Sequence, residues 1–231
     1  MKPITVYWAC AEEAWMAATP PEEVLSSAKK KYTPDLHEPL AEVFSCPAFT
    51  DNLKNVYSLK SIYSYEFTKK DGEISTPCFD EKFFKDHVII RSLDLNFFSF
   101  QTKYVFFTDA PSLKTTFYEY PYLEDNNITN RCIPVAGVFD IAKWFKTTEF
   151  AFYLKSGVST FKIDSNEVYA YMRFHTEHPI KFVQFSYTET MKEYQKDGFF
   201  LTWLRLKKLD AYYSMFKNKK RILKEIKGNL I

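Results

Sequence analysis

A histidine-rich segment, RFHTEHP (residues 173–179), carries the side chains that most resemble metal ligands in this sequence. His175, Glu177 and His178 offer two imidazoles and a carboxylate, which is the donor set of many iron and zinc sites. Helical metal-binding motifs place their two histidines four residues apart, so that both lie on one helix face. Here the spacing is three, beside Pro179 and between two strand-like runs, which favours a polar turn over a metal-dependent enzyme.

Two carboxylates, Asp140 and Glu149, bracket an aromatic segment and could serve as an acid and a base. The motifs that would support an enzyme are missing from the sequence. It has no GxSxG nucleophile elbow, and none of its four cysteines lies in a glycine-rich turn. It has neither GxGxxG nor GxxxxGK[ST], and only 5 glycines from which a phosphate-binding loop could be built. The sequence therefore predicts no cofactor and favours a non-enzymatic protein.

The aromatic segment VFDIAKWFK (residues 138–146) predicts a strand, a short helical turn and a second strand. Asp140 is placed to cap the turn through its side chain, as aspartate does at helix starts. The turn would bring Phe139 and Trp144 to one face beside Phe145, with Trp144 as the buried plug. Burial of these rings would contribute roughly 3 to 5 kcal/mol, so we expect a structural element that joins two sheets.

The C-terminal segment 188–231 is basic and has helical periodicity. It holds 11 basic and 5 acidic side chains, a net charge of +6, so the rest of the chain carries −4 of the total of +2. A helix here could bind phosphates in a salt-dependent and sequence-independent way; the candidate cations are Lys217, Lys219, Lys220, Arg221 and Lys224.

The same segment could instead be a docking helix, with its apolar side on the domain or on a partner and its lysines in water. The residues of that side are Leu209, Tyr213, Phe216, Leu223 and Ile226. The chain has 26 lysines and only 5 arginines, which disfavours bidentate recognition of bases or phosphates and favours docking. Gly198 could end an earlier helix, and Gly228 is a suitable stop for the last one.

Strand patterns fill the middle of the chain. After a strand at 4–10 and a helix beginning at Pro21, β-branched and aromatic runs predict strands within 55–67, 87–93, 97–109 and 111–121. Asp71-Gly72 is a hairpin signal. Four further runs have hairpin-sized separators and predict an antiparallel meander; they span 149–155, 158–164, 167–174 and 180–188.

Composition sets the remaining limits. Aromatic residues make up 19% of the chain, which is typical of a binding surface, of a β-rich core, or of an A/T-rich coding sequence. No apolar run approaches the ~18 to 20 residues of a membrane span, and the N-terminus lacks a secretory signal, so we expect a cytosolic protein. The widely spaced cysteines, which we expect to be buried small residues, are Cys10, Cys46, Cys78 and Cys132.

Several segments resemble an uncharacterised protein family of tailed bacteriophages of the marine and cyanobacterial type. They are FDIAKWFKTTEFAFYLK (139–155), YMRFHTEHPIKFVQF (171–185), ITVYWAC (4–10) and CPAFTDNLKN (46–55). The family pattern has Arg-Pro after KWF, where this chain has Lys146 and Thr147, so no role of that arginine carries over. The resemblance excludes the basic tail and implies a viral origin, but brings no activity with it.

These patterns together predict a mostly β (α+β) fold, an antiparallel meander or sandwich with short N-terminal helices and a C-terminal amphipathic basic helix. We expect one β-rich domain at 1–187 and a helical, basic extension at 188–231. The expected function is that of a non-enzymatic, virion-associated structural or accessory phage protein, in the virion or the host cytoplasm. Its partners would be phage or host proteins, or further copies of itself. The alternatives are a nucleic-acid-associated phage factor and a metal-dependent enzyme.

Overall fold

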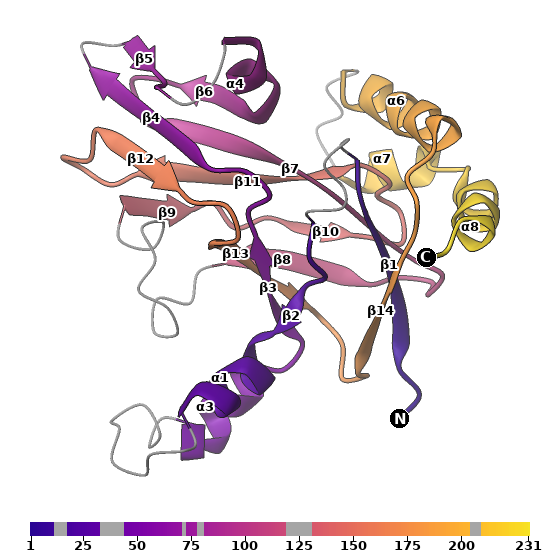
Figure 1. Cartoon of the computed structure of the whole chain (residues 1–231). Helices are drawn as coiled ribbons and strands as arrows, with labels where there is room; N and C mark the ends of the chain where they lie inside the picture. Colours follow the sequence, from indigo (N-terminus) through magenta and orange to yellow (C-terminus); the bar gives the residue numbers. More distant parts are fainter. Residues whose placement is uncertain (12–17, 33–43, 71–72, 78–80, 119–130, 204–208) are drawn as a thin grey trace.

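The structure, a computed structural model, describes residues 1–11, 18–32, 44–70, 73–77, 81–118, 131–203 and 209–231. These residues form a mostly β fold with helices at both ends of the sequence (Figure 1), as the sequence predicts. Cys78, the hairpin residues Asp71 and Gly72, and the end of the strand predicted at 111–121 lie outside the described residues.

The largest sheet, sheet A, has the strand order β14-β1-β7-β11-β9, with β6 beside the first half of β7. Strand β1 is paired on both sides, in parallel with β14 and antiparallel with β7. The strands are β1 (Ile4–Cys10), β6 (Val88–Ser92), β7 (Phe97–Thr108), β9 (Cys132–Pro134), β11 (Thr147–Leu154) and β14 (Ile180–Gln184).

Two smaller sheets complete the β structure. Sheet B has the order β10-β8-β13-β3-β2, from β2 (Glu22–Glu23), β3 (Val56–Lys60), β8 (Lys114–Tyr118), β10 (Val138–Asp140) and β13 (Val168–Phe174). Sheet C has the order β12-β4-β5, from β4 (Tyr65–Lys70), β5 (Glu73–Ser75) and β12 (Thr160–Ile163). The predicted hairpin at Asp71-Gly72 is confirmed in that β4 and β5 pair antiparallel on either side of it.

The predicted antiparallel meander of the last four strands is wrong. All four strands exist, but β11 and β14 belong to sheet A, β12 to sheet C and β13 to sheet B, so no two consecutive ones pair. Each of them instead pairs with a strand far away in sequence, such as β12 with β4 and β14 with β1. The short segments between these four strands therefore connect one sheet to another instead of forming hairpins.

Sheets A and B pack face to face around an aromatic core. Tyr57 of β3 contacts Phe182 of β14 with ring centroids 4.9 Å apart, and Phe106 of β7 contacts Phe174 of β13 at 6.4 Å. Sheet C closes one end of this core, where Phe67 and Phe161 stack at 5.0 Å. The high aromatic content thus serves sheet packing, in which each large ring contributes roughly 2 to 3 kcal/mol through burial.

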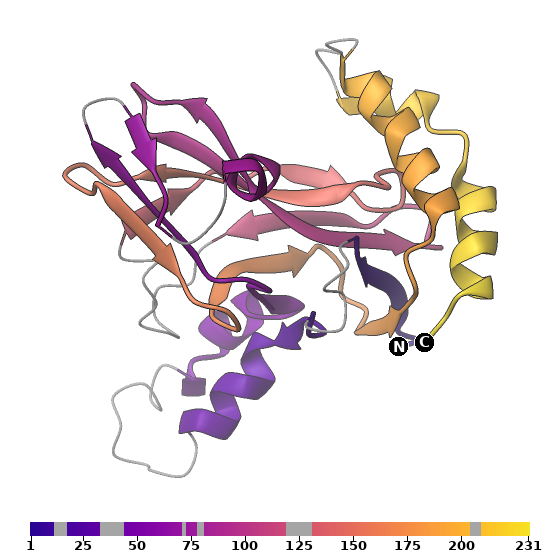
Figure 2. The same ribbon diagram turned by 45° about the horizontal axis from the view of Figure 1, so that its top comes forward.

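Helices cover the outer faces of both large sheets. Val6 and Trp8 of β1 point into the inner core, whereas Tyr7 and Ala9 point to the opposite face of sheet A. The C-terminal helices cover that face, as Figure 2 shows: α6 (Glu189–Trp203), α7 (Leu209–Met215) and α8 (Lys219–Gly228). On the outer face of sheet B lie α1 (Val24–Tyr32) and α3 (Pro47–Asn52), and α4 (Glu81–His87) precedes β6. The order of layers is helix, sheet A, sheet B, helix.

Several local predictions need correction. The helix predicted from Pro21 begins at Val24, because Glu22 and Glu23 pair with β3 as the short strand β2. Gly198 lies inside α6 rather than ending a helix, whereas α8 does end at Gly228. Leu209 was predicted on the apolar side of the tail but is 45% exposed.

Among the described cysteines, Cys10 and Cys132 are buried as expected and Cys46 is exposed. No helix in the described ranges has the length and apolar character needed to cross a membrane.

Candidate functional site

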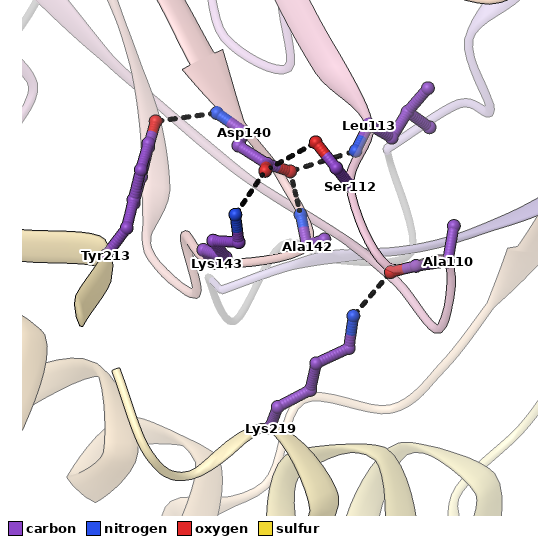
Figure 3. A network of polar contacts seen from close by, with 8 residues as sticks. All are labelled: Ala110, Ser112, Leu113, Asp140, Ala142, Lys143, Tyr213 and Lys219. Carbon is purple, nitrogen blue, oxygen red and sulfur yellow. Dashed lines mark hydrogen bonds and ion pairs between the residues drawn. The ribbon is translucent and has the colours of Figure 1, made fainter. Parts of the chain in front are cut away.

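The carboxylate of Asp140 is the centre of a buried polar network at the end of β10 (Figure 3). Oδ1 accepts hydrogen bonds from the backbone N–H groups of Leu113 at 2.9 Å and Ala142 at 3.0 Å. Oδ2 accepts from the Ser112 hydroxyl at 2.8 Å and forms an ion pair with Lys143 at 3.3 Å. The predicted Asp-capped turn is therefore confirmed, and the same carboxylate also binds the loop before β8.

The electrostatics of this network favour the ionised carboxylate. Burial by itself opposes ionisation of Asp140, but the hydrogen bonds from Leu113, Ser112, Ala142 and Lys143 outweigh it, so its pKa lies below the ordinary value. With all its oxygen positions engaged by the protein, the group lacks the raised pKa of a general acid. Its role in this arrangement is to hold two sheet segments together.

The network also attaches the C-terminal helices to the sheets. The backbone N–H of Asp140 donates to the hydroxyl of Tyr213 in α7 at 2.7 Å. Lys219, at the start of α8, donates from Nζ to the carbonyl of Ala110 in the β7–β8 turn (Figure 3). Burial lowers the pKa of Lys219, although the carboxylates of Asp140 and Asp109 favour its charged form. Thus one of the five cations predicted to contact phosphates is part of the fold instead.

The aromatic residues of the same segment have roles that the sequence predicts only in part. Phe139 and Trp144 come together across the turn, as expected, with ring centroids 5.8 Å apart. The buried plug, however, is Phe145, which is 1% exposed and contacts Phe107 at 5.3 Å on the outer face of sheet A. Trp144 is half-buried, and its ring lies 5.0 Å from that of Tyr212 in α7.

Lys146, which follows the aromatic pair Trp144 and Phe145, is a buried lysine. It is 4% exposed, and its Nζ lies 5.0 Å from the Trp144 ring centroid and 5.2 Å from that of Tyr212. Burial lowers the pKa of Lys146 to about 8, against the opposing attraction of Glu149. In the sequence Lys146 is visible only as a cation next to two aromatic residues. The ring of Tyr212, which completes its surroundings, belongs to α7.

The stability of the protein should depend on the charge of Lys146. The unfolded lysine has a pKa near 10.4, so above pH ~8 the unfolded chain binds a proton that the folded chain has released. Relative to the variant Lys146→Met, the wild-type free energy of unfolding should therefore rise by about 2 kcal/mol between about pH 7 and pH 9.5. Urea unfolding of both proteins at several pH values measures this difference, and a pH-independent difference would contradict it.

The histidine candidates do not form a metal site. His175 shares a 2.7 Å hydrogen bond with the Thr116 hydroxyl, and burial, with Arg173 and Lys114 nearby, lowers its pKa. The Nδ1 of His178 lies 3.1 Å from the carbonyl of Lys2. Glu177 pairs with Lys54, whose hydrogen bond lowers the glutamate pKa. In the part of the chain that the structure describes, no three His, Cys, Asp or Glu side chains gather as metal ligands would.

The backbone turn, rather than metal chemistry, explains how these three residues are arranged. Asn55 adopts the left-handed conformation with φ of 55°, and its buried side-chain amide donates to the carbonyls of Thr176 at 2.6 Å and His178 at 3.1 Å. Asparagine tolerates this conformation better than other non-glycine residues. The polar turn predicted as the alternative to a metal site is confirmed. The other carboxylate, Glu149, pairs with Arg91 on the surface of sheet A.

The basic tail leaves four cations exposed, three of them on α8 and one, Lys217, two residues before it. We call Lys217, Lys220, Arg221 and Lys224 the basic strip; they follow a spacing of three and four residues, and all are exposed. Within the described residues none of the four forms an ion pair, in contrast to Lys227, which lies 3.4 Å from Asp109. On the other side of α8, Ile222 and Ile226 are fully buried against sheet A.

An open groove lies between α6 and α8 at one end of the basic strip. The groove has a volume of about 450 Å³ and is lined by Tyr194, Arg221, Lys224, Glu225, Gly228 and Asn229. Thr188, directly before α6, donates its hydroxyl to Glu225 of α8 at 3.0 Å. Because the groove contains two cations of the strip and one aromatic ring, it is a candidate binding site.

Comparisons with known proteins yield no similarity from which a function could be inferred: no family, no curated protein and no solved structure matches this chain.

Proposed function

We propose that this chain is a non-enzymatic binding protein of phage type, and that its basic strip binds the phosphates of nucleic acid. One observation carries the proposal: α8 buries Ile222 and Ile226 against its own sheet. The basic strip, formed by α8 and by Lys217 just before it, points outward without acidic partners among the described residues. Phosphates are the common biological partners of such a surface. The viral origin follows from the family resemblance and is part of the proposal.

The position of the charges supports a role beyond solubility. Lys219, Lys220 and Arg221 occupy the first turn of α8, which has no acidic residue. Cations at a helix N-terminus oppose the helix dipole and destabilise the helix by about 0.3 to 1 kcal/mol each. A sequence selected for helix stability alone would place acids there. The helix tolerates these cations because burial of its apolar side supplies its stability.

The docking interpretation of the tail allowed the apolar side of the helix to lie on the domain or on a partner, and the first of these places is the one observed. This leaves the apolar side of α8 occupied within the folded protein. In α8 that side packs against Tyr7, Phe107 and Phe185, and the chain continues into a bridge between Phe185 and Leu230. In the folded protein, the side of α8 that other molecules can contact consists mainly of charged side chains.

Fluorescence anisotropy with labelled DNA and RNA oligonucleotides tests the proposal. If the four cations contact phosphates, affinity should fall about a hundredfold between about 50 and 200 mM salt. Replacing all four cations of the strip by glutamine should abolish most of this dependence. A matched control replaces four exposed lysines elsewhere, namely Lys2, Lys70, Lys82 and Lys181. Absence of wild-type binding at low salt, or equal losses in both variants, would contradict the proposal.

A second candidate function is protein–protein contact within a phage particle, and it too has a specific observation in its favour. The segment that links sheets A and B through β9 and β10 exposes three aliphatic side chains: Ile133 at 53%, Val135 at 36% and Val138 at 51%. Both strands are at the edge of their sheets, where another chain could pair. Mass spectrometry of purified particles tests this candidate, and absence of the protein from them would remove it.

A further inference from the structure

The groove between α6 and α8 differs from the rest of the basic strip in having an aromatic wall. Tyr194 of α6 is half-buried: it packs against the cluster that contains Tyr7 and Met191 and also lines the groove. The ring is therefore anchored by the fold and accessible from the groove. Aromatic rings in positively charged grooves stack on the bases of single-stranded nucleic acids, which contributes about 1 to 3 kcal/mol per base.

The charges in the groove are favourable for a phosphate. Arg221 and Lys224 carry no ion pair within the described residues. The one acid, Glu225, is engaged by the fold: it accepts the hydroxyl of Thr188 at 3.0 Å, and the side-chain amide of Asn229 lies 3.5 Å from it and donates to its backbone carbonyl at 2.9 Å. The groove thus combines two available cations with a carboxylate whose Oε1 already has donors.

The shape of the groove is also compatible with a nucleotide. Its volume of about 450 Å³ lies in the range of small-molecule sites, about 300 to 1,000 Å³. Gly228 ends α8 at the groove, and a Cβ added there would meet no atom within 4 Å, so the backbone leaves this end open. A strand could continue from the groove along the basic strip towards Lys220 and Lys217.

We propose that the groove binds one nucleotide of a single-stranded nucleic acid, with the base on Tyr194 and the adjoining phosphates on Arg221 and Lys224. The inference rests on the proposed function and specifies its ligand. A duplex keeps its bases stacked inside the helix, where Tyr194 cannot reach them, so it engages only the cations of the strip. Single strands should therefore bind more tightly than duplexes of the same length.

The test compares a single-stranded DNA oligonucleotide with its duplex by fluorescence anisotropy at fixed salt. The wild type should prefer the single strand by about tenfold. Tyr194→Leu should lose most of that preference but keep the salt dependence, because stacking releases no counterions. Tyr194→Phe, which retains the aromatic ring, should behave as the wild type. Arg221→Gln combined with Lys224→Gln should weaken both ligands and reduce the salt dependence.

The possible outcomes separate the groove from the strip. Equal binding of single strand and duplex by the wild type, or a preference that survives Tyr194→Leu, overturns the inference about the groove and leaves the proposed function intact. Absence of binding to either ligand overturns both. Circular dichroism checks that Tyr194→Leu is folded. If it is not, the double variant decides, since its two side chains are exposed: weaker binding of the single strand, with the preference from Tyr194 retained, supports the inference, and unchanged binding of the single strand overturns it.

Discussion

Truncation of the chain before Asp210 is expected to yield a protein that aggregates rather than a folded body without its tail. The missing segment contains Ile222 and Ile226, both fully buried against the outer face of sheet A. Loss of each isoleucine side chain alone costs about 2 to 5 kcal/mol, and the total stability of a domain is about 5 to 15 kcal/mol. Truncation would in addition expose the rings of Tyr7, Phe107 and Phe145. Size-exclusion chromatography and light scattering measure the outcome.

Single substitutions in α8 provide the matched comparison. Ile226→Ala should lower the free energy of unfolding by about 3 kcal/mol, whereas Lys220→Ala, on the exposed side of the same helix, should change it by less than about 0.5 kcal/mol. A truncated protein that remains monodisperse with an unchanged melting temperature would show that the removed segment does not contribute to the stability of the fold. Aggregation would mean that residues 210–231 complete the fold of the preceding chain.

Replacement of Asp140 should be the most damaging single polar substitution in the described chain. Asp140→Ala removes the acceptor for Ser112 and for the buried N–H groups of Leu113 and Ala142. Buried donors without acceptors cost about 1 to 3 kcal/mol each, so we expect a loss of about 4 kcal/mol in the free energy of unfolding. Urea denaturation followed by tryptophan fluorescence measures it.

Asp140→Asn is the control for charge. It keeps an acceptor oxygen and should cost about 2 kcal/mol at neutral pH. Since the folded-state pKa of Asp140 lies below that of the unfolded chain, the contribution of the charge is complete above the unfolded pKa of about 3.9 and is lost as pH falls through the folded value. The difference between wild type and Asp140→Asn should shrink in acid. A difference that is the same at pH ~3 and pH ~7 would contradict the charged network.

Patterns within single elements were predictable from the sequence, and pairings between distant elements were not. The Asp140 cap depends on residues within the segment 138–146 and follows from local stereochemistry. The four runs after residue 148 were predicted as strands, but a local pattern cannot reveal that β12 joins β4 or that β14 lies parallel to β1. Short separators favour hairpins unless long-range packing gains more, as it does here through the aromatic core.

The same distinction applies to the site. The five tail cations were visible as charges, but only the packing of α8 separates Lys219, which binds the Ala110 carbonyl, from the four cations of the strip. Trp144 was predicted as the plug, whereas Phe145 occupies that position because it points to the side of sheet A that α8 covers. Lys146 and Tyr194 were missed because their neighbours come from other elements. Tyr212 of α7 lies beside Lys146, and residues of α8 line the groove with Tyr194.

The position of β1 in the middle of sheet A has a consequence for biosynthesis. This strand is made first, yet its hydrogen-bonding partners are Tyr104 to Thr108 on one side and Ile180 to Gln184 on the other. At translation rates of about 5 to 20 residues per second, its second partner leaves the ribosome about 10 to 35 seconds later. During that interval the emerging chain holds an apolar strand without its neighbours. Nascent chains that stall before residue 180 should therefore be recognised by chaperones or proteases and not accumulate as folded fragments.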